Sequence, residues 1–265
     1  MHPPILKVQR LSKYYPILKG VFKKPAGVVK AVDDVSFSIA KKETLALVGE
    51  SGSGKSTTAR AAIRLIEPTS GQITFLGQDL MALNTAHLKT ARLKCQMVFQ
   101  DPYGSLNPRR SIEQSMGEAL LYYGLAASRD ELREKVAELL RLVGLSPGLI
   151  DRYPHELSGG QQQRVCIGRA LSTNPELLIC DEALSSLDVS VRAQIINLLL
   201  DLQKEKELSY LFISHDLATV QHLADTVAVM HKGRIIETKP TAAIFSEPEA
   251  DYTKKLLKAI PKLGH

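Results

Sequence analysis

A glycine-rich segment at residues 49–57, Gly-Glu-Ser-Gly-Ser-Gly-Lys-Ser-Thr, has the residue types and spacing of a phosphate-binding loop. An apolar run at 45–48 precedes it, and we expect a helix over 58–66 after it. Glycines let backbone N–H groups turn towards phosphate oxygens, and the helix N-terminus adds a positive dipole. In such a loop Lys55 reaches the β- and γ-phosphates, and the Ser56 hydroxyl ligates Mg²⁺. The residues expected to contact a nucleotide here are Gly49, Ser51, Gly52, Ser53, Gly54, Lys55, Ser56 and Thr57.

Two acidic residues follow a second apolar run. Residues 177–180 have the composition of a buried strand and are followed by Asp181 and Glu182. Asp181 is placed to join the Mg²⁺ shell. Glu182 is placed to orient or deprotonate the water that attacks a phosphate. Strands often end in acids, so this pattern becomes informative only beside the phosphate-binding loop.

A second helix start with anion-binding character lies at residues 157–161, Leu-Ser-Gly-Gly-Gln. Ser158 and two glycines precede a helix that we expect to run to Leu171, so free N–H groups and the helix dipole again favour an anion. A capped helix after a flexible loop is the plainer interpretation, but it does not account for the whole pentapeptide and its surroundings. One nucleotide need not touch both helix starts in the same subunit.

The order of the loop, Leu-Ser-Gly-Gly-Gln and the strand ending at Asp181 resembles the ATP-binding subunit of an ABC transporter, from about Ile5 to Pro261. The resemblance implies ATP and Mg²⁺ as cofactors. It also implies a head-to-tail dimer, in which Lys55 of one subunit and Ser158 of the other clamp the same ATP. Outside the loop, the implied nucleotide contacts are Tyr15, Ser158, Gly159, Gly160, Gln161 and Asp188.

Four further positions match motifs of this family. Gln100 resembles the Q-loop glutamine, and His215 resembles the switch histidine that contacts the γ-phosphate. Asp188 resembles the D-loop aspartate that crosses to the other subunit. Tyr15 resembles the aromatic residue that stacks on adenine, with Tyr14 as the neighbouring alternative. The resemblance therefore implies Glu182, His215 and Gln100 as catalytic residues, and Ser56, Gln100 and Asp181 as metal contacts.

Three segments resemble dipeptide, oligopeptide and nickel importers: residues 101–109, 152–156 and 252–261. The basic insertion between Tyr15 and Val32 is similar to that of the second ATPase subunit of peptide permeases. This implies an ATP-hydrolysing energy-coupling subunit of an importer of di- or oligopeptides, with a nickel or antimicrobial-peptide-resistance system as the alternative. A soluble ABC protein of translation or DNA repair, and a regulatory subunit without turnover, are less favoured.

The resemblance also implies where the chain acts and with which partners. These are integral membrane permease subunits, a second ATPase subunit that is identical or related, and indirectly a solute-binding protein. No nucleic acid partner is expected. The implied location is peripheral, on the cytoplasmic face of the inner (plasma) membrane.

The elements that must position these residues alternate between strands and helices. We therefore expect an α/β protein with a mostly parallel sheet. The resemblance implies a P-loop NTPase core with an N-terminal antiparallel β-subdomain and an inserted helical subdomain. One domain should span 1–265, with the core and β-subdomain at about 1–100 and 171–265 and the helical subdomain at about 101–170. Within the β-subdomain we expect strands at 5–11 and 35–39 and an exposed basic loop at 19–30.

Bulk properties fit this expectation. The 265 residues are 44% hydrophobic with a net charge of +6, and no stretch approaches the ~18 apolar residues of a membrane span. The three cysteines, Cys95, Cys166 and Cys180, are far apart and lack metal-ligand spacing, which favours reduced thiols.

Overall fold

The computed structural model describes residues 3–19 and 24–259. The chain divides into two compact units, one made of residues 1–91 and 209–265 and the other of residues 92–208. Both contain strands and helices, as expected of an α/β protein. The predicted boundaries of a helical subdomain at about 101–170 stay a prediction.

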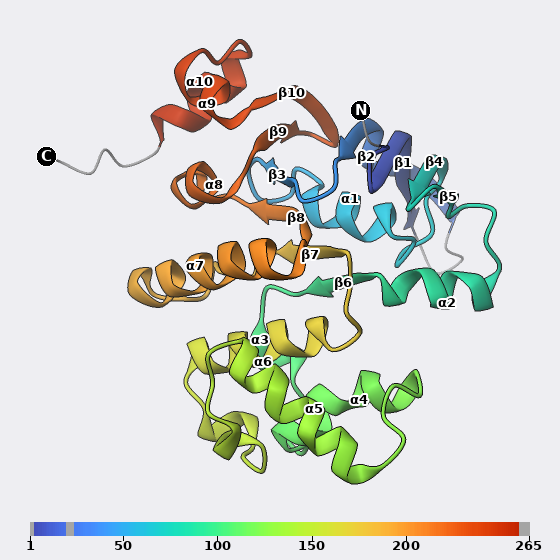
Figure 1. Ribbon diagram of the computed structural model, residues 1–265. Coiled ribbons are helices and arrows are strands. Elements are labelled where there is room, and N and C mark those ends of the chain that lie inside the picture. Colours follow the sequence, from blue (N-terminus) through green and yellow to red (C-terminus); the bar gives the residue numbers. More distant parts are fainter. Residues whose placement is uncertain (1–2, 20–23, 260–265) are drawn as a thin grey trace, which may run out of the picture. The chain divides into compact units, whose positions relative to one another are not determined.

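The first unit contains a four-stranded antiparallel sheet in the order β2-β1-β4-β5 (Figure 1). Val8 of β1 lies opposite Phe37 of β2 and Ile73 of β4, and all three side chains are buried. The strands are β1 (Leu6–Lys19), β2 (Lys24–Ile39), β4 (Ser70–Phe75) and β5 (Gln78–Asp79).

The predicted basic loop over 19–30 is wrong for residues 24–30, which form the first half of β2; residues 20–23 lie outside the described part of the chain. Tyr15 pairs with Val29, and Pro16 pairs with Val28, on the neighbouring strand. Aromatic and β-branched residues favour such cross-strand pairs. The lysines and Pro25 indicate a loop locally, but the partner strand decides the structure.

The same unit contains parallel strands around the glycine-rich loop. β3 (Thr44–Val48) pairs in parallel with β8 (Ser209–Ser214) and β9 (Thr226–His231), and β10 (Arg234–Pro240) pairs antiparallel with β9. β3 and β8 are buried throughout, which explains their continuous apolar runs. The helices of this unit that follow β3, β8 and β10 are α1 (Lys55–Ala62), α8 (Leu217–Leu223), α9 (Thr241–Ser246) and α10 (Asp251–Lys258).

Helix α1 differs from the helix predicted over 58–66. It begins three residues earlier, at Lys55, because Gly54 takes the left-handed conformation and caps it. It ends at Ala62, and Arg64 shortly after it has a positive φ of 53°. The Arg64 guanidinium donates hydrogen bonds to the carbonyl oxygens of Leu80 (2.7 Å) and Leu83 (2.9 Å), which fixes this turn.

The second unit contains the parallel pair β6 (Cys95–Val98) and β7 (Leu177–Asp181) and most of the helices. Ser128 accepts a hydrogen bond of 3.1 Å from the Glu131 N–H and so caps the helix that begins at Arg129. Its helices are α3 (Pro102–Ser105), α4 (Ile112–Tyr122), α5 (Arg129–Leu142), α6 (Gly159–Leu171) and α7 (Val189–Lys206), with 3₁₀ turns η1 (Pro147–Leu149) and η2 (Pro154–Glu156). α2 (Thr85–Leu93) spans the boundary between the units in the sequence.

Candidate functional site

Two glycines of the loop after β3 are required by close backbone contacts. A Cβ atom on Gly49, whose φ is +153°, would lie 2.1 Å from the Met230 carbonyl oxygen. A Cβ atom on Gly54, whose φ is +106°, would lie 2.2 Å from the Ala31 carbonyl oxygen. A side chain at either position would push the loop away from β9 or β2.

Lys55 is the buried cation of this loop. Its side chain is 3% exposed, and Nζ donates hydrogen bonds to the carbonyl oxygens of Gly49 (2.8 Å) and Glu50 (2.9 Å). Helix α1 has no acidic residue in its first turn, and its cap, Gly54, makes no side-chain hydrogen bond. The first turn therefore adds no negative charge at the positive end of the helix, and the α1 amides with the ammonium form a donor set that fits phosphate oxygens.

The remaining loop residues surround this cation. Ser56 and Thr57 lie half-buried in the first turn of α1, while Ser51 and Gly52 are exposed. The Ser53 hydroxyl is buried without a hydrogen-bond partner among the described residues, so the loop retains unused polar capacity. These positions agree with the predicted phosphate-contacting role, which stays a prediction.

His215 follows β8 on a turn fixed by its neighbours. The Ser214 hydroxyl accepts the Asp216 N–H at 2.9 Å, and Asp216 caps α8 by accepting N–H groups of that helix. His215 itself is exposed. Because Val48 lies opposite Ser214 in the parallel ladder, His215 and Gly49 leave neighbouring strands at the same edge.

A polar cluster holds the segment around Tyr14. Asp33 is 7% exposed and accepts a hydrogen bond of 2.5 Å from the Tyr14 hydroxyl and one of 2.6 Å from the Arg234 guanidinium. These partners lower the pKa of Asp33 to about 2, with Tyr14 as the largest cause. Tyr15 is 41% exposed, and the Lys13 ammonium lies 4.9 Å from its ring centroid.

In the second unit, two acids end β7. Asp181 is 2% exposed. Glu182 has a positive φ of 49°, which is uncommon outside glycine, and its carbonyl oxygen accepts hydrogen bonds from the Ser185 N–H (3.1 Å) and hydroxyl (2.9 Å). The backbone therefore turns directly after the buried Asp181. Strained backbone of this kind is common at functional sites.

Gln100 follows β6, the strand paired with β7, and is exposed. Val98 lies opposite Cys180, so Gln100 and Asp181 leave neighbouring strands at one edge. The segment after Gln100 begins with Asp101, which caps α3 by accepting the Tyr103 N–H at 2.9 Å. This turn leaves Tyr103 65% exposed.

Ser158 caps α6 through a reciprocal pair of hydrogen bonds. Its hydroxyl accepts the Gln161 N–H at 3.3 Å, and the Gln161 side-chain oxygen accepts the Ser158 N–H at 2.9 Å. Gly160 is close to α7, because a Cβ atom there would lie 2.6 Å from the Val191 side chain. Gly159, the first residue of α6, has more room, with its nearest neighbour at 3.9 Å.

Asp188 and Gln162 support these helices. Asp188 caps α7 by accepting the Val191 N–H at 2.9 Å. Gln162 is fully buried and donates to the carbonyl oxygens of Pro154 (2.7 Å) and Leu157 (3.2 Å), which holds the turn before α6. Sequence analysis missed Gln162, although its place beside the Leu-Ser-Gly-Gly-Gln segment was an available signal.

The cysteines take no part in this chemistry. Cys95, Cys166 and Cys180 are buried and unbridged, as the sequence predicts. Burial raises the pKa of Cys166 to about 11 and that of Cys180 to about 12. The thiols therefore stay protonated and unreactive at neutral pH.

The predicted residues thus fall into two groups. Each group lies within one unit and follows the ends of its parallel strands. The first comprises the loop with Lys55 and Ser56, together with His215; the second comprises Gln100, Asp181 and Glu182. Among the described residues, no group of three or more His, Cys, Asp or Glu side chains is arranged to hold a metal ion. No helix in the described part of the chain is long and apolar enough to cross a membrane.

Comparison with known proteins identifies the family. Residues 32–185 match the family model described as ABC transporter. The oligopeptide transport ATP-binding protein AppF of Bacillus subtilis is 51% identical over 258 residues, covering 97% of this chain and 78% of AppF. The glutathione import ATP-binding protein GsiA of Salmonella paratyphi A is also 51% identical over 258 residues, but this chain spans only 41% of GsiA.

Solved structures agree. The structure of cbiO1 from Clostridium perfringens, part of the ABC transporter complex cbiONQ, is 29% identical with a TM-score of 0.79, covering 100% of this chain and 98% of that one. The ATP-binding cassette MJ0796, in a dimeric post-hydrolysis state with ADP and Pi, is 27% identical with a TM-score of 0.78, covering 89% of this chain and 98% of that one.

Proposed function

The chain belongs to the ABC transporter family, and from this premise we propose that it hydrolyses ATP to drive the import of short peptides. The observation that carries the ATPase part is the buried Lys55, the first residue of a helix that has no acidic residue in its first turn. A strand ending in Asp181 and Glu182 supports the same chemistry.

In this proposal the chain's own groups share the work of phosphoryl transfer. The Lys55 ammonium and the α1 amides neutralise phosphate charge, and Glu182 orients and deprotonates the attacking water. His215 contacts the γ-phosphate. Ser56, Asp181 and Gln100 would hold Mg²⁺, which would supply positive charge to the phosphates. Few protein ligands suffice, because Mg²⁺ keeps waters and phosphates in its shell.

The second helix start belongs to a dimer in this proposal. The ATP bound by the partner subunit is contacted by Ser158, Gly159, Gly160 and Gln161. Asp188 lies near the point where the D-loop crosses to the partner subunit. The dimeric MJ0796 cassette supports this arrangement. The partner is an identical or a related ATPase subunit. The dimer sits peripherally on the cytoplasmic face of the membrane, where permease subunits contact the surface around the exposed Tyr103.

The relatives support the choice of solute. AppF and GsiA are named for oligopeptides and for glutathione, a tripeptide derivative. Import of peptides is therefore favoured over import of nickel and over a role in resistance to antimicrobial peptides. A solute-binding protein and the permeases would select the particular peptide.

Replacing Lys55 with Ala tests the ATPase proposal. Loss of one preorganised charge-stabilising group typically costs ~10²–10³-fold in turnover. Hydrolysis by the complex with its permeases should fall at least that far, with weaker nucleotide binding. Lys255→Ala, at an exposed position of α10, is the matched control and should hydrolyse normally. Equal turnover in both variants would contradict the proposal.

A further inference from the structure

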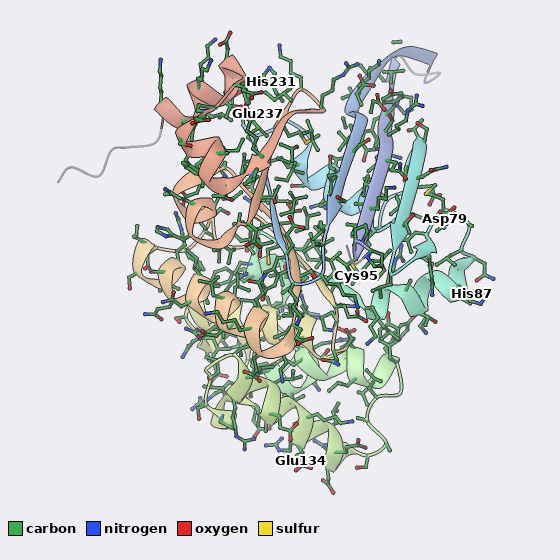
Figure 2. The ribbon with its side chains drawn as sticks, turned by 45° about the horizontal axis from the view of Figure 1, so that its top comes forward. Asp79, His87, Cys95, Glu134, His231 and Glu237 are labelled. Carbon is green, nitrogen blue, oxygen red and sulfur yellow. The ribbon has the colours of Figure 1, made fainter. Side chains whose placement is uncertain are left out.

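Tyr252, the second residue of α10, contacts the glycine-rich loop. Its hydroxyl oxygen accepts a hydrogen bond of 3.1 Å from the Glu50 N–H, 202 positions away in the sequence. Its ring lies against the His231 imidazole, with centroids 4.0 Å apart. Figure 2 labels His231 at the end of β9, next to the C-terminal helices. The phenol therefore lies between the β9 end and the loop.

The same peptide unit that donates to Tyr252 also accepts from Lys55. This unit joins Gly49 to Glu50, with the N–H of Glu50 at one end and the carbonyl of Gly49 at the other. The carbonyl oxygen accepts a hydrogen bond of 2.8 Å from Lys55 Nζ. Hydrogen bonds to both ends of a peptide polarise each other and resist its rotation. The position of the phosphate-binding cation is thus linked to a phenol on the last described helix.

The start of α10 is fixed independently of the loop. Glu237 of β10 is 8% exposed and accepts hydrogen bonds from the N–H groups of Glu249 (2.8 Å) and Ala250 (3.0 Å). Burial alone would raise the pKa of Glu237, but these amides and the Lys239 ammonium lower it below its usual value, so it is a carboxylate at neutral pH. Ala250 supplies no side-chain cap of its own. Glu237 therefore holds the segment that leads into α10, up to two residues before Tyr252.

We propose that Tyr252 is a positioning residue for ATP binding: through the Gly49–Glu50 peptide it holds Lys55 where the phosphates arrive. The inference rests on the proposed ATP binding at Lys55. Phe at this position would keep the ring on His231 and remove the acceptor. The Glu50 N–H would then donate its hydrogen bond to water. The peptide that orients Lys55 would lose one of the two hydrogen bonds that hold it.

The test compares Tyr252→Phe and Tyr252→Leu with wild type, using binding of a fluorescent ATP analogue with Mg²⁺ to the purified full chain. Loss of one hydrogen bond corresponds to about a 2- to 10-fold rise in Kd. Tyr252→Phe should show this rise, with KM for ATP rising more than kcat falls in the permease complex. The Kd of Tyr252→Leu should exceed that of Tyr252→Phe by no more than about the same factor. Its Tm should be lower, because the ring contact with His231 is lost. Lys255→Ala is again the control on the same helix.

The outcomes separate this inference from the proposed function. If wild type does not bind the analogue, the ATPase proposal fails. If wild type binds and Tyr252→Phe binds with equal affinity, the positioning role is refuted. The role is also refuted if affinity falls only in Tyr252→Leu, in step with its lower Tm, because Tyr252 would then hold the fold alone.

Discussion

The Tyr14 hydroxyl donates a hydrogen bond of 2.5 Å to the Asp33 carboxylate, and this bond separates the roles of two adjacent tyrosines. A lysine ammonium lies near each ring, Lys30 at 5.4 Å from the Tyr14 centroid and Lys13 at 4.9 Å from the Tyr15 centroid, so the hydroxyl bond and the exposure distinguish the two. Tyr15 is 41% exposed and pairs with Val29 across β2. Of the two candidates left open by the sequence, we therefore propose Tyr15 as the residue that stacks on adenine.

We therefore predict that Tyr15→Ala weakens nucleotide binding and Tyr14→Phe does not. Stacking of a base on an aromatic ring contributes ~1–3 kcal/mol by alanine substitution, so Kd for ATP should rise about 5- to 150-fold. Tyr15→Phe keeps a ring and should bind as wild type does. The measurement is titration with ATP and Mg²⁺. Because Tyr14→Phe also keeps a ring, Tyr14→Ala is the comparison for stacking, and a larger loss for it than for Tyr15→Ala would exchange the two roles.

Asp33 should make stability depend on pH in the acid range. Its pKa is about 2 in the folded protein against an ordinary 3.8, because Tyr14 and Arg234 bond the carboxylate. The folded state thus favours the charged form, and the stabilisation is complete above about pH 4 and disappears as the pH falls towards 2. The difference in Tm between wild type and Asp33→Asn should be constant above that range and shrink below it. Asp201→Asn, at an exposed position of α7, is the control. A difference that stays constant down to pH 2.5 would contradict this role.

The sequence predicts elements whose signals are local. The apolar run before Gly49 is an example, because its signal lies within one strand, β3. The strand at 24–30 could not be predicted this way, because its lysines and Pro25 favour a loop unless the partner strand is known. The left-handed turn at Arg64 that ends α1 also depends on distant acceptors, the carbonyls of Leu80 and Leu83.

The residues of the candidate site could likewise be predicted only where the signal is local. Lys55 and Asp181 lie in motifs that predict them, and the structure places Lys55 at the start of α1 and Asp181 at the end of β7. Asp33 and Tyr252 were missed. Asp33 is bonded to Arg234, 201 positions away, and Tyr252 to Glu50, 202 positions away. No spacing rule links such pairs, so only the fold reveals them.

Ser158→Arg should spare ATP binding and block hydrolysis. The Ser158 hydroxyl accepts the Gln161 N–H, so the variant loses a helix cap, which typically costs ~1 kcal/mol of stability. Ser158→Ala loses the same cap without adding bulk or charge, which makes it the matched control. Nucleotide affinity and turnover should be measured side by side on the dimer. If Ser158→Arg loses both in equal measure, α6 acts within its own subunit or merely holds the fold.

The central claim is that Glu182 activates water for ATP hydrolysis, and Glu182→Gln tests it most directly. Gln has the shape of Glu and must adopt the same left-handed backbone conformation at position 182, but it cannot act as a base. A general base typically contributes ~10²–10⁴-fold in rate. Turnover should fall by about that factor with ATP still bound, and the ATP-loaded dimer should accumulate in size-exclusion chromatography with Mg²⁺. Lys55→Ala, which should bind ATP poorly, is expected to stay monomeric under the same conditions. Hydrolysis by Glu182→Gln at the wild-type rate would contradict the account.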